Sequence, residues 1–381
     1  MNRQGRHAVA ADTVFDGHVA QHHCAVLIDG AQIVWVGPRQ ELSGNVPIHE
    51  LPAGSWLAPG FIDVQVNGGG DVLFNDEPTS AGLARIVAAH RRHGTTALMP
   101  TLLSDTPAKM RAALQVVQEP PAGVLGIHFE GPFLSPEKPG VHDAAMLRCP
   151  TSDDLTLLVS QHPGITLVTL APEQVPAGFI AELAKAGVVV ALGHSMATYA
   201  QTKAALAEGL TGFTHLFNAM RPLASREPGP IAAALESSNA WFGMIVDGAH
   251  VDPAMLRLAL RGLAHPMLVT DGMPPAGGSR YTFLLYGKQI ETRGELCITK
   301  EGTFAGTALD MASAVRNCVH LLGVSLPSAL RYASYEPALF LGVANRLGRL
   351  VESWQADMVA FDPDNIRILG TWVAGGWAES M

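Results

Sequence analysis

Five apolar runs in the middle of the sequence each lead into an ionisable side chain, in chain order Glu130, His194, His215, His250 and Asp271. One carboxylate and two imidazoles are the ligand types that hold a catalytic zinc ion while a fourth position stays open to water. We therefore predict that Glu130, His194 and His215 bind a metal ion, provided that their strands end at one rim. A buried Glu-His hydrogen-bond network without a metal is the alternative.

Asp271 follows the last of these runs and offers a second kind of chemistry. A metal makes bound water more acidic, but a nearby base must still accept the proton and later return one to the leaving group. An aspartate that faces the open metal position can do both. The alternative is that Asp271 is a capping or turn residue before Gly272.

We expect structural roles for five other histidines, His90, His93, His162, His265 and His320, because His is often partly buried in folded proteins.

The elements that must position these residues are short apolar strands that alternate with helix-like segments. We predict strands at 60–67, 95–102, 124–130, 165–171, 188–194, 212–217, 242–247 and 266–271. The segment 80–93 has amphipathic spacing and is followed by Gly94, as is typical of a crossover helix. Eight such alternations favour an α/β fold of the parallel (β/α)8 TIM-barrel type over a doubly wound open sheet, and in these barrels the active site lies at the C-terminal ends of the strands.

The two ends of the sequence predict a second, smaller domain. Residues 24–36 contain two β-rich runs around Asp29-Gly30, a strong hairpin signal, and residues 356–361 and 366–373 read as another pair of strands. We therefore expect a small β-sandwich domain formed by residues 1–58 and 349–381 around a barrel formed by residues 59–348.

Composition limits the classes of function. Hydrophobic residues make up 48% of the 381 residues, yet there is no apolar run of about 18 residues that would suggest a membrane span. A net charge of −9 without Lys/Arg runs gives no surface for nucleic acid or for an anionic membrane. The polar N-terminus does not resemble a signal peptide, and four scattered cysteines do not suggest a disulfide framework. We therefore expect a cytoplasmic protein that acts on a small molecule.

A set of motifs along nearly the whole chain resembles the N-acetylglucosamine-6-phosphate deacetylases of the amidohydrolase superfamily. The motifs are Pro59-Gly-Phe-Ile-Asp63, His128-Phe-Glu-Gly-Pro132, Gly140-Val-His-Asp143, Leu170-Ala-Pro-Glu173, Gly193-His-Ser195, Thr214-His-Leu-Phe-Asn-Ala-Met220, Arg226-Glu-Pro-Gly229, Asp247-Gly-Ala-His250, Val269-Thr-Asp271 and Ala305-Gly-Thr307. The resemblance implies hydrolysis of the acetamide of N-acetylglucosamine 6-phosphate to glucosamine 6-phosphate and acetate, in amino-sugar catabolism or cell-wall recycling.

The resemblance also implies roles for individual residues. It agrees with Glu130, His194 and His215 as metal ligands and with Asp271 as the acid/base, and it adds His142 as a pocket residue that we suggest polarises the acetyl carbonyl. The substrate-binding residues that it implies are Val141, His142, Asn218, Ala219, Arg226, His250, Phe304, Ala305, Gly306 and Thr307. Part of the phosphate site in this family comes from across a dimer interface, which implies a homodimer.

Gln65 and Asn67 stand where relatives with two metals carry a His-x-His pair. Both should face the barrel interior, because residues two apart in a strand share a face. Neutral amides bind zinc less well than imidazole does. We therefore predict one divalent ion per subunit, expected to be Zn²⁺, although Fe²⁺, Co²⁺ or Mn²⁺ can share such a site. The two amides are predicted to hydrogen bond beneath the metal site, with simple filling of the barrel as the alternative.

Three other functions stay open at this point. Gly272, Met273 and the loop 304–307 differ from the residues expected of the family, so the substrate could instead be a related 6-phosphate such as N-acetylgalactosamine 6-phosphate. A different amidohydrolase that opens cyclic amides would usually need two metals. A sugar-phosphate sensor on a non-catalytic barrel would have no need of a metal and a general base.

Overall fold

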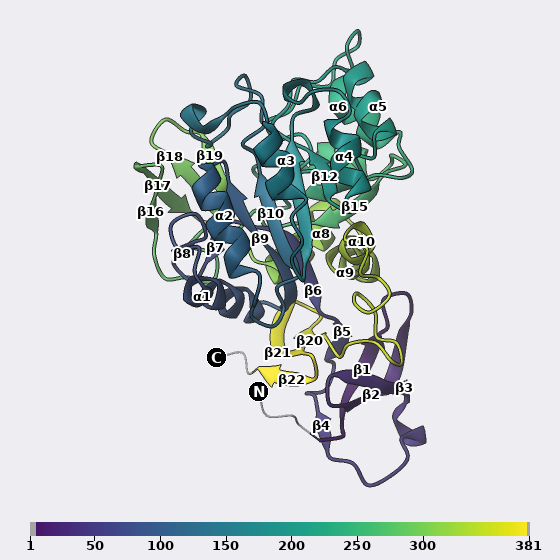
Figure 1. Cartoon of the computed structure of the whole chain (residues 1–381). Helices are drawn as coiled ribbons and strands as arrows, with labels where there is room; N and C mark the ends of the chain where they lie inside the picture. Colours follow the sequence, from purple (N-terminus) through teal and green to yellow (C-terminus); the bar gives the residue numbers. More distant parts are fainter. Residues whose placement is uncertain (1–4, 379–381) are drawn as a thin grey trace.

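The computed structural model of the chain describes residues 5–378 and shows a barrel above a smaller sheet (Figure 1). The barrel strands are β6 (Phe61–Val66), β9 (Thr95–Leu103), β10 (Gly126–Glu130), β11 (Ile165–Leu170), β12 (Val189–Leu192), β13 (Gly212–Phe213), β14 (Trp241–Met244) and β15 (His265–Leu268). They form one parallel sheet in the order β15-β14-β13-β12-β11-β10-β9-β6, and a bridge between Val66 and Gly272 spans the remaining gap. The predicted TIM-type barrel is confirmed, with all eight predicted strands present.

Helices connect the strands and cover the outside of the barrel (Figure 1). They are α1 (Ser80–Arg91), α2 (Pro107–Val116), α3 (Ser152–Leu158), α4 (Phe179–Lys185), α5 (Tyr199–Ala207), α6 (Gly229–Leu235), α7 (Pro253–Ala259), α8 (Met311–Leu322), α9 (Leu326–Ala333) and α10 (Tyr335–Phe340). Helix α1 is the segment predicted from its spacing. Thr79 caps its first turn by accepting a hydrogen bond from Gly82 N, and the chain leaves it through Gly94 at φ +87°.

Four barrel strands end two or more residues earlier than the apolar runs suggested. Strands β12, β13, β14 and β15 stop at Leu192, Phe213, Met244 and Leu268, whereas the predicted ends are 194, 217, 247 and 271. For β12, β13 and β15 the reason is local backbone geometry: His194, His215 and Asp271 have φ values of 48°, 32° and 51°. A strand requires strongly negative φ, so residues in the left-handed region end it. Such conformations are uncommon outside glycine, and they cluster at functional sites.

Both ends of the chain meet in the second sheet. Its strands are β1 (His7–Phe15), β2 (Ala20–Asp29), β3 (Gln32–Pro38), β4 (Ile48–Glu50), β5 (Trp56–Pro59), β20 (Met358–Asp362), β21 (Arg367–Val373) and β22 (Gly376–Ala378). The antiparallel pair β5 and β20 joins the two ends, and β2 and β3 form the predicted hairpin. The separate sheet domain is therefore confirmed. The boundaries near residues 58 and 348 stay predictions, and residues 1–4 and 379–381 lie outside the described residues.

Strand β20 shows how this sheet is attached to the barrel. Its side chains alternate between two faces: Val359 and Phe361 belong to the barrel core, and Met358 and Ala360 belong to a second core that includes Trp372. A strand with two apolar faces must be covered on both sides. The sheet thus rests on the N-terminal end of the barrel strands, away from the predicted site.

A four-stranded antiparallel sheet between β15 and α8 was not predicted. It consists of β16 (Thr282–Leu285), β17 (Lys288–Arg293), β18 (Leu296–Thr299) and β19 (Phe304–Thr307). A bridge between Gly272 and Thr307 fastens β19 beside the residue that follows Asp271. A short ribbon of β7 (Gly68–Gly69) and β8 (Val72–Leu73) follows β6. Between residues 5 and 378, no helix is both long enough and apolar enough to cross a membrane.

Candidate active site

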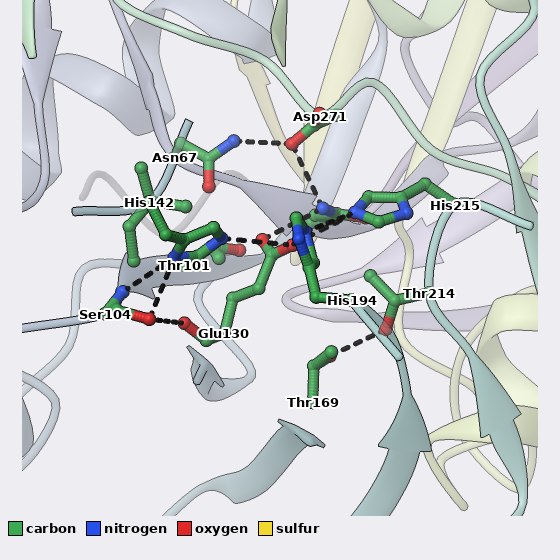
Figure 2. Close-up of polar contacts among 12 residues, drawn as sticks. Asn67, Thr101, Ser104, Glu130, His142, Thr169, His194, Thr214, His215 and Asp271 are labelled. Carbon is green, nitrogen blue, oxygen red and sulfur yellow. Dashed lines mark hydrogen bonds and ion pairs between the residues drawn. The ribbon is translucent and has the colours of Figure 1, made fainter. Parts of the chain in front are cut away.

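Glu130, His194 and His215 converge at the C-terminal rim of the barrel, as Figure 2 shows. His194 Nε2 and His215 Nε2 each lie 3.1 Å from Glu130 Oε1, and they lie 3.2 Å from each other. All three residues are buried. Ligands at zinc bond lengths of about 2.0–2.1 Å are separated by roughly 3.3 Å in a tetrahedral site, so this triangle has the size that one such ion requires.

The hydrogen bonds around these residues also fit a metal site. His194 Nδ1 lies 2.8 Å from the carbonyl oxygen of Lys138, which can only accept, so Nδ1 carries the proton and Nε2 presents its lone pair. A metal-binding histidine commonly has its other nitrogen fixed in this way. Although burial opposes ionisation of Glu130, the neighbouring imidazoles of His142, His194 and His215 hold its pKa well below the usual range. The three residues can therefore hold a divalent cation.

Asp271 faces this cluster, and within residues 5–378 only one of its two carboxylate oxygens accepts hydrogen bonds. Its Oδ1 accepts hydrogen bonds from Asn67 Nδ2 at 2.7 Å and from Gln65 Nε2 at 3.0 Å. Gln65 Nε2 also donates to Glu130 Oε2 at 3.1 Å, so one amide joins the metal cluster to the aspartate. Burial, with the nearby charge of Glu130, raises the pKa of Asp271 to about 6. A carboxylate with a raised pKa and one unshared oxygen can both accept and return a proton near neutral pH.

His142 lies on the other side of the cluster. Its Nε2 is 3.8 Å from Glu130 Oε1, and its ring stands edge-on to the ring of His194 with 4.6 Å between the centroids. Burial lowers the pKa of His142 to about 4, so the ring is neutral at physiological pH. A neutral imidazole in this place can donate one hydrogen bond toward the metal cluster.

A network of hydroxyl groups supports the ligands from below (Figure 2). Buried His128, two residues before Glu130, contacts Thr101 Oγ1 at 3.0 Å and Thr169 Oγ1 at 2.8 Å. Thr169 in turn shares a 2.6 Å hydrogen bond with Thr214, the residue before His215. Hydrogen bonds inside the barrel therefore link β10, which carries Glu130, through Thr169 to the segment that carries His215.

The cluster forms the floor of a pocket of about 320 Å³, a volume within the range of small-molecule sites. Twelve of the predicted site residues line it: Asn67, Glu130, Val141, His142, His194, His215, Asn218, Ala219, His250, Asp271, Phe304 and Gly306. Asn67 Oδ1 is buried there and accepts no hydrogen bond from any residue between 5 and 378.

Four predicted site residues lie outside the pocket lining. Gln65 lies beneath it, and Ala305, within β19, is buried in a small core with Leu103 and Met273. Thr307 hydrogen bonds to the loop that carries Asp271: its hydroxyl donates to Thr270 O at 2.6 Å and its backbone N–H donates to Asp271 O at 3.1 Å. Arg226 is exposed, and no hydrogen bond or ion pair joins it to the rest of the described chain.

Several pocket residues were not among the predicted site residues, namely Leu103, Glu137, Lys138, Pro139, Gly140, Ile245, Met273 and Thr303. Most lie next to a predicted residue. Lys138, for example, precedes the Gly140-Val-His142 motif by two positions, and Met273 follows Asp271 by two. Proximity to these motifs was the available signal, because most of these side chains are apolar or small; Glu137 and Lys138 carry charges but lie outside the motifs and strand ends that guided the prediction.

Comparison with known proteins gives the same picture. The amidohydrolase family profile matches residues 56–378. An N-acetylgalactosamine-6-phosphate deacetylase from Shewanella sp. (strain ANA-3) is 39% identical over 97% of this chain and 94% of its own length. An N-acetylglucosamine-6-phosphate deacetylase from Haemophilus influenzae is 34% identical over 93% and 95%. The crystal structure of N-acetylglucosamine-6-phosphate deacetylase from Pasteurella multocida superposes with a TM-score of 0.94 at 34% identity, covering 98% of this chain and 100% of that one.

These matches extend over the barrel, the second sheet and the pocket alike, and the family is one of metal-dependent enzymes, in keeping with the Glu-His-His cluster. The chain is therefore a hydrolase of the amidohydrolase family, in the group that contains the N-acetylglucosamine-6-phosphate deacetylases.

Proposed function

We propose that this chain hydrolyses the acetamide bond of N-acetylglucosamine 6-phosphate to give glucosamine 6-phosphate and acetate. The observation that carries the proposal is the arrangement of Asp271 and His142 on two sides of a three-ligand cluster, inside a pocket of the size of a small ligand. The relatives that share the whole chain support the substrate class, since they carry the names of amino-sugar-phosphate deacetylases.

The proposed cofactor is one zinc ion bound by Glu130, His194 and His215. When bound, the ion would polarise the acetyl carbonyl and make a water molecule more acidic. The amides of Gln65 and Asn67 support a single ion, because their nitrogen atoms already donate hydrogen bonds to Asp271. Amide nitrogens used as donors cannot replace the imidazole ligands of a second site.

The residues of the chain divide the proton transfers between them. Asp271 accepts the proton of the attacking water and returns it to the amine nitrogen as the C–N bond breaks. The two amides keep Oδ1 occupied, so Oδ2 is the atom that we assign to this transfer. His142 donates from Nε2 to the acetyl oxygen and so stabilises the negative charge that develops there.

The phosphate of the substrate would lie at the outer part of the pocket, near Asn218, Ala219 and His250. The backbone N–H of Ala219 makes no hydrogen bond to residues 5–378, which leaves a donor for a phosphate oxygen. Asp247 Oδ2 lies 2.6 Å from His250 Nδ1 and holds that ring in place. We further propose that Arg226 completes the site of the partner in a homodimer, because Arg226 is exposed and makes no hydrogen bond or ion pair within residues 5–378.

N-acetylgalactosamine 6-phosphate is the second candidate substrate. The specific observation is the 39% identity to the deacetylase of that name from Shewanella. The two sugars differ in the configuration at one hydroxyl group, which a few pocket contacts can discriminate. All four cysteines are free thiols, which supports our expectation that the reaction takes place in the reducing cytoplasm.

Acetate release from metal-stripped protein during a zinc titration tests these proposals together. We expect activity to reach a plateau near one equivalent per chain, with one of the two sugar phosphates giving the higher kcat/KM. A plateau near two equivalents would overturn the single-ion proposal. Absence of acetate release from both sugars, with zinc, iron, cobalt or manganese supplied, would overturn the proposed function.

A further inference from the structure

Ser104 is a buried residue that no motif singled out, yet it makes the closest contact to His142. It directly follows β9, at the same rim as the metal cluster. Its hydroxyl oxygen lies 2.8 Å from His142 Nδ1, and its backbone N–H donates to the same nitrogen atom at 3.2 Å. Figure 2 shows both contacts and a longer one of 3.4 Å between Ser104 Oγ and the backbone oxygen of Glu130. Two groups of one residue therefore meet one ring nitrogen.

These contacts determine where His142 carries its proton. A backbone N–H can only donate, so Nδ1 must accept and cannot itself be protonated. A protonated ring, which has N–H groups on both nitrogens, would face the Ser104 N–H with a second donor. The single proton of the neutral ring is therefore on Nε2, and Nε2 faces the metal cluster, 3.8 Å from Glu130 Oε1.

The position of Ser104 is itself fixed from three sides. Tyr286, at the turn between β16 and β17, donates its hydroxyl to Ser104 O at 2.7 Å. The side chain of Asn75 hydrogen bonds to the backbone of Leu103, the residue before Ser104: it accepts from Leu103 N at 2.9 Å and donates to Leu103 O at 3.0 Å. Gly131 leaves the space that the hydroxyl occupies, because a Cβ at Gly131 would lie 2.3 Å from Ser104 Oγ. The glycine of the His128-Phe-Glu-Gly-Pro132 motif thus has a packing role in this contact.

We propose that Ser104 is a positioning residue that holds His142 as a hydrogen-bond donor at Nε2, directed toward the reacting carbonyl. The kinetic part of this inference rests on the proposed function, whereas the position of the proton does not. Tyr286 connects the unpredicted sheet β16–β19 to the same task, since its hydroxyl anchors the serine from that sheet.

The first experiment observes the imidazole nitrogens of the zinc-loaded protein by NMR after selective ¹⁵N labelling of histidine, with His142→Gln to identify the signals. We expect a proton on Nε2 of His142 and an unprotonated, hydrogen-bonded Nδ1. In Ser104→Ala, the Nδ1 signal should shift because its shorter hydrogen bond is lost. A proton on Nδ1 in the unmodified protein, or unchanged signals in Ser104→Ala, would overturn the proposal.

The second experiment is a double-mutant cycle on acetate release. Ser104→Ala should lower kcat about tenfold with KM changed less than about twofold, because the lost contact affects the reacting group more than substrate binding. If Ser104 acts through His142, the same substitution should have no further effect in His142→Gln. Additive losses in the double variant would overturn the proposal. Ser55→Ala, which removes a buried hydroxyl with no partner among residues 5–378, is the matched control.

Failure of the proposed function would look different. If the unmodified protein releases no acetate from either sugar phosphate, the function is wrong, and the nitrogen signals alone then decide whether Ser104 sets the proton on His142. Metal content and urea unfolding, measured for every variant, identify variants that have lost the fold.

Discussion

At the scale of single residues, Asp271 combines a strained backbone with a carboxylate of which one oxygen accepts hydrogen bonds and the other accepts none within residues 5–378. Its φ of 51° and the two amide donors on Oδ1 both fix the direction of Oδ2. Asp271→Asn keeps the size of the side chain and an oxygen for the amides, but it removes the base. We expect kcat to fall by about 10²–10⁴-fold, the range typical of a lost general acid/base.

The measurement for Asp271→Asn is acetate release together with metal content. The metal should remain near one ion per chain, because Glu130, His194 and His215 are unchanged. Turnover close to that of the unmodified protein would rule out Asp271 as the acid/base.

Gln65 and Asn67 allow a second prediction at this scale. Gln65 Nε2 lies 3.1 Å from Glu130 Oε2 and 3.0 Å from Asp271 Oδ1, so a metal ligand placed there would find two carboxylates close by. Gln65→His combined with Asn67→His should therefore raise zinc stoichiometry from about one to about two ions per chain. Elemental analysis after dialysis measures the change. A value that stays at one would show that these two positions do not decide the number of ions.

The sequence predicted residue types better than residue geometry. Glu130, His194 and His215 were identifiable because metal binding requires particular side chains at strand ends. The left-handed backbone conformations of His194, His215 and Asp271 were not, because any residue type other than glycine is normally expected in a strand or turn with negative φ. Ser104 was missed for a related reason: its role depends on contacts with His142 and Gly131, which are distant in sequence.

At the scale of elements, helix α1 supports the loops of the active site through His90. This residue is 2% exposed, and its Nε2 donates to Gly68 O at 2.9 Å. Gly68 N then donates to Gly272 O at 2.8 Å, so one chain of hydrogen bonds runs beside Asn67 and Asp271. His90, for which we had expected a structural role, thus links a helix to the loops that follow β6 and β15.

The buried ring of His90 gives a pH prediction. Burial lowers its pKa from 6.5 to about 4, so between these values the unfolded chain binds a proton that the folded chain does not. The folded state therefore loses stability as the pH falls through this window. His90→Gln keeps a donor for Gly68 O but cannot titrate. Relative to this variant, the unmodified protein should lose about 2 kcal/mol of unfolding free energy between pH 7.5 and pH 5.

Urea unfolding of both proteins at the two pH values measures the difference. Because all other titrating groups are shared, their contributions cancel in the comparison. Equal pH dependence in the two proteins would show that His90 is not held neutral in the folded state.

Strands and the helix α1 were predictable because their signals are local, whereas the sheet β16–β19 was not. Its strands alternate irregularly, and exposed Tyr281 and Leu284 obscure the pattern of one apolar face. Its stability depends on a small cluster that includes Leu103 and Met273 from the barrel rim. An element that is completed by residues far away in sequence cannot be read from its own segment alone.

At the scale of the whole molecule, the two chain ends form one sheet that is fastened to the barrel through the shared core around Phe361. This arrangement leaves the catalytic rim free of the second domain. The pocket itself is lined by two carboxylates of the catalytic set, Glu130 and Asp271, and a dianionic phosphate must be bound nearby in spite of them. The exposed Arg226 lies outside this pocket, which is the reason for expecting help from a second copy of the chain.

Mixing two impaired variants tests that expectation directly. Arg226→Ala should raise KM for the sugar phosphate with little effect on metal content, and Asp271→Asn should abolish turnover. If Arg226 serves the pocket of the partner, a mixed dimer contains one pocket with an intact Asp271 and an arginine supplied by the other subunit. After the two variants are unfolded and refolded together in equal amounts, about a quarter of all pockets should be complete, because half of the dimers are mixed and each has one intact pocket.

Acetate release at a substrate concentration below the KM of Arg226→Ala should then exceed the sum of the activities of the two variants refolded separately. Activity equal to that sum would show that Arg226 does not act across an interface, and a monomer in sedimentation at the same protein concentration would rule out the shared site altogether.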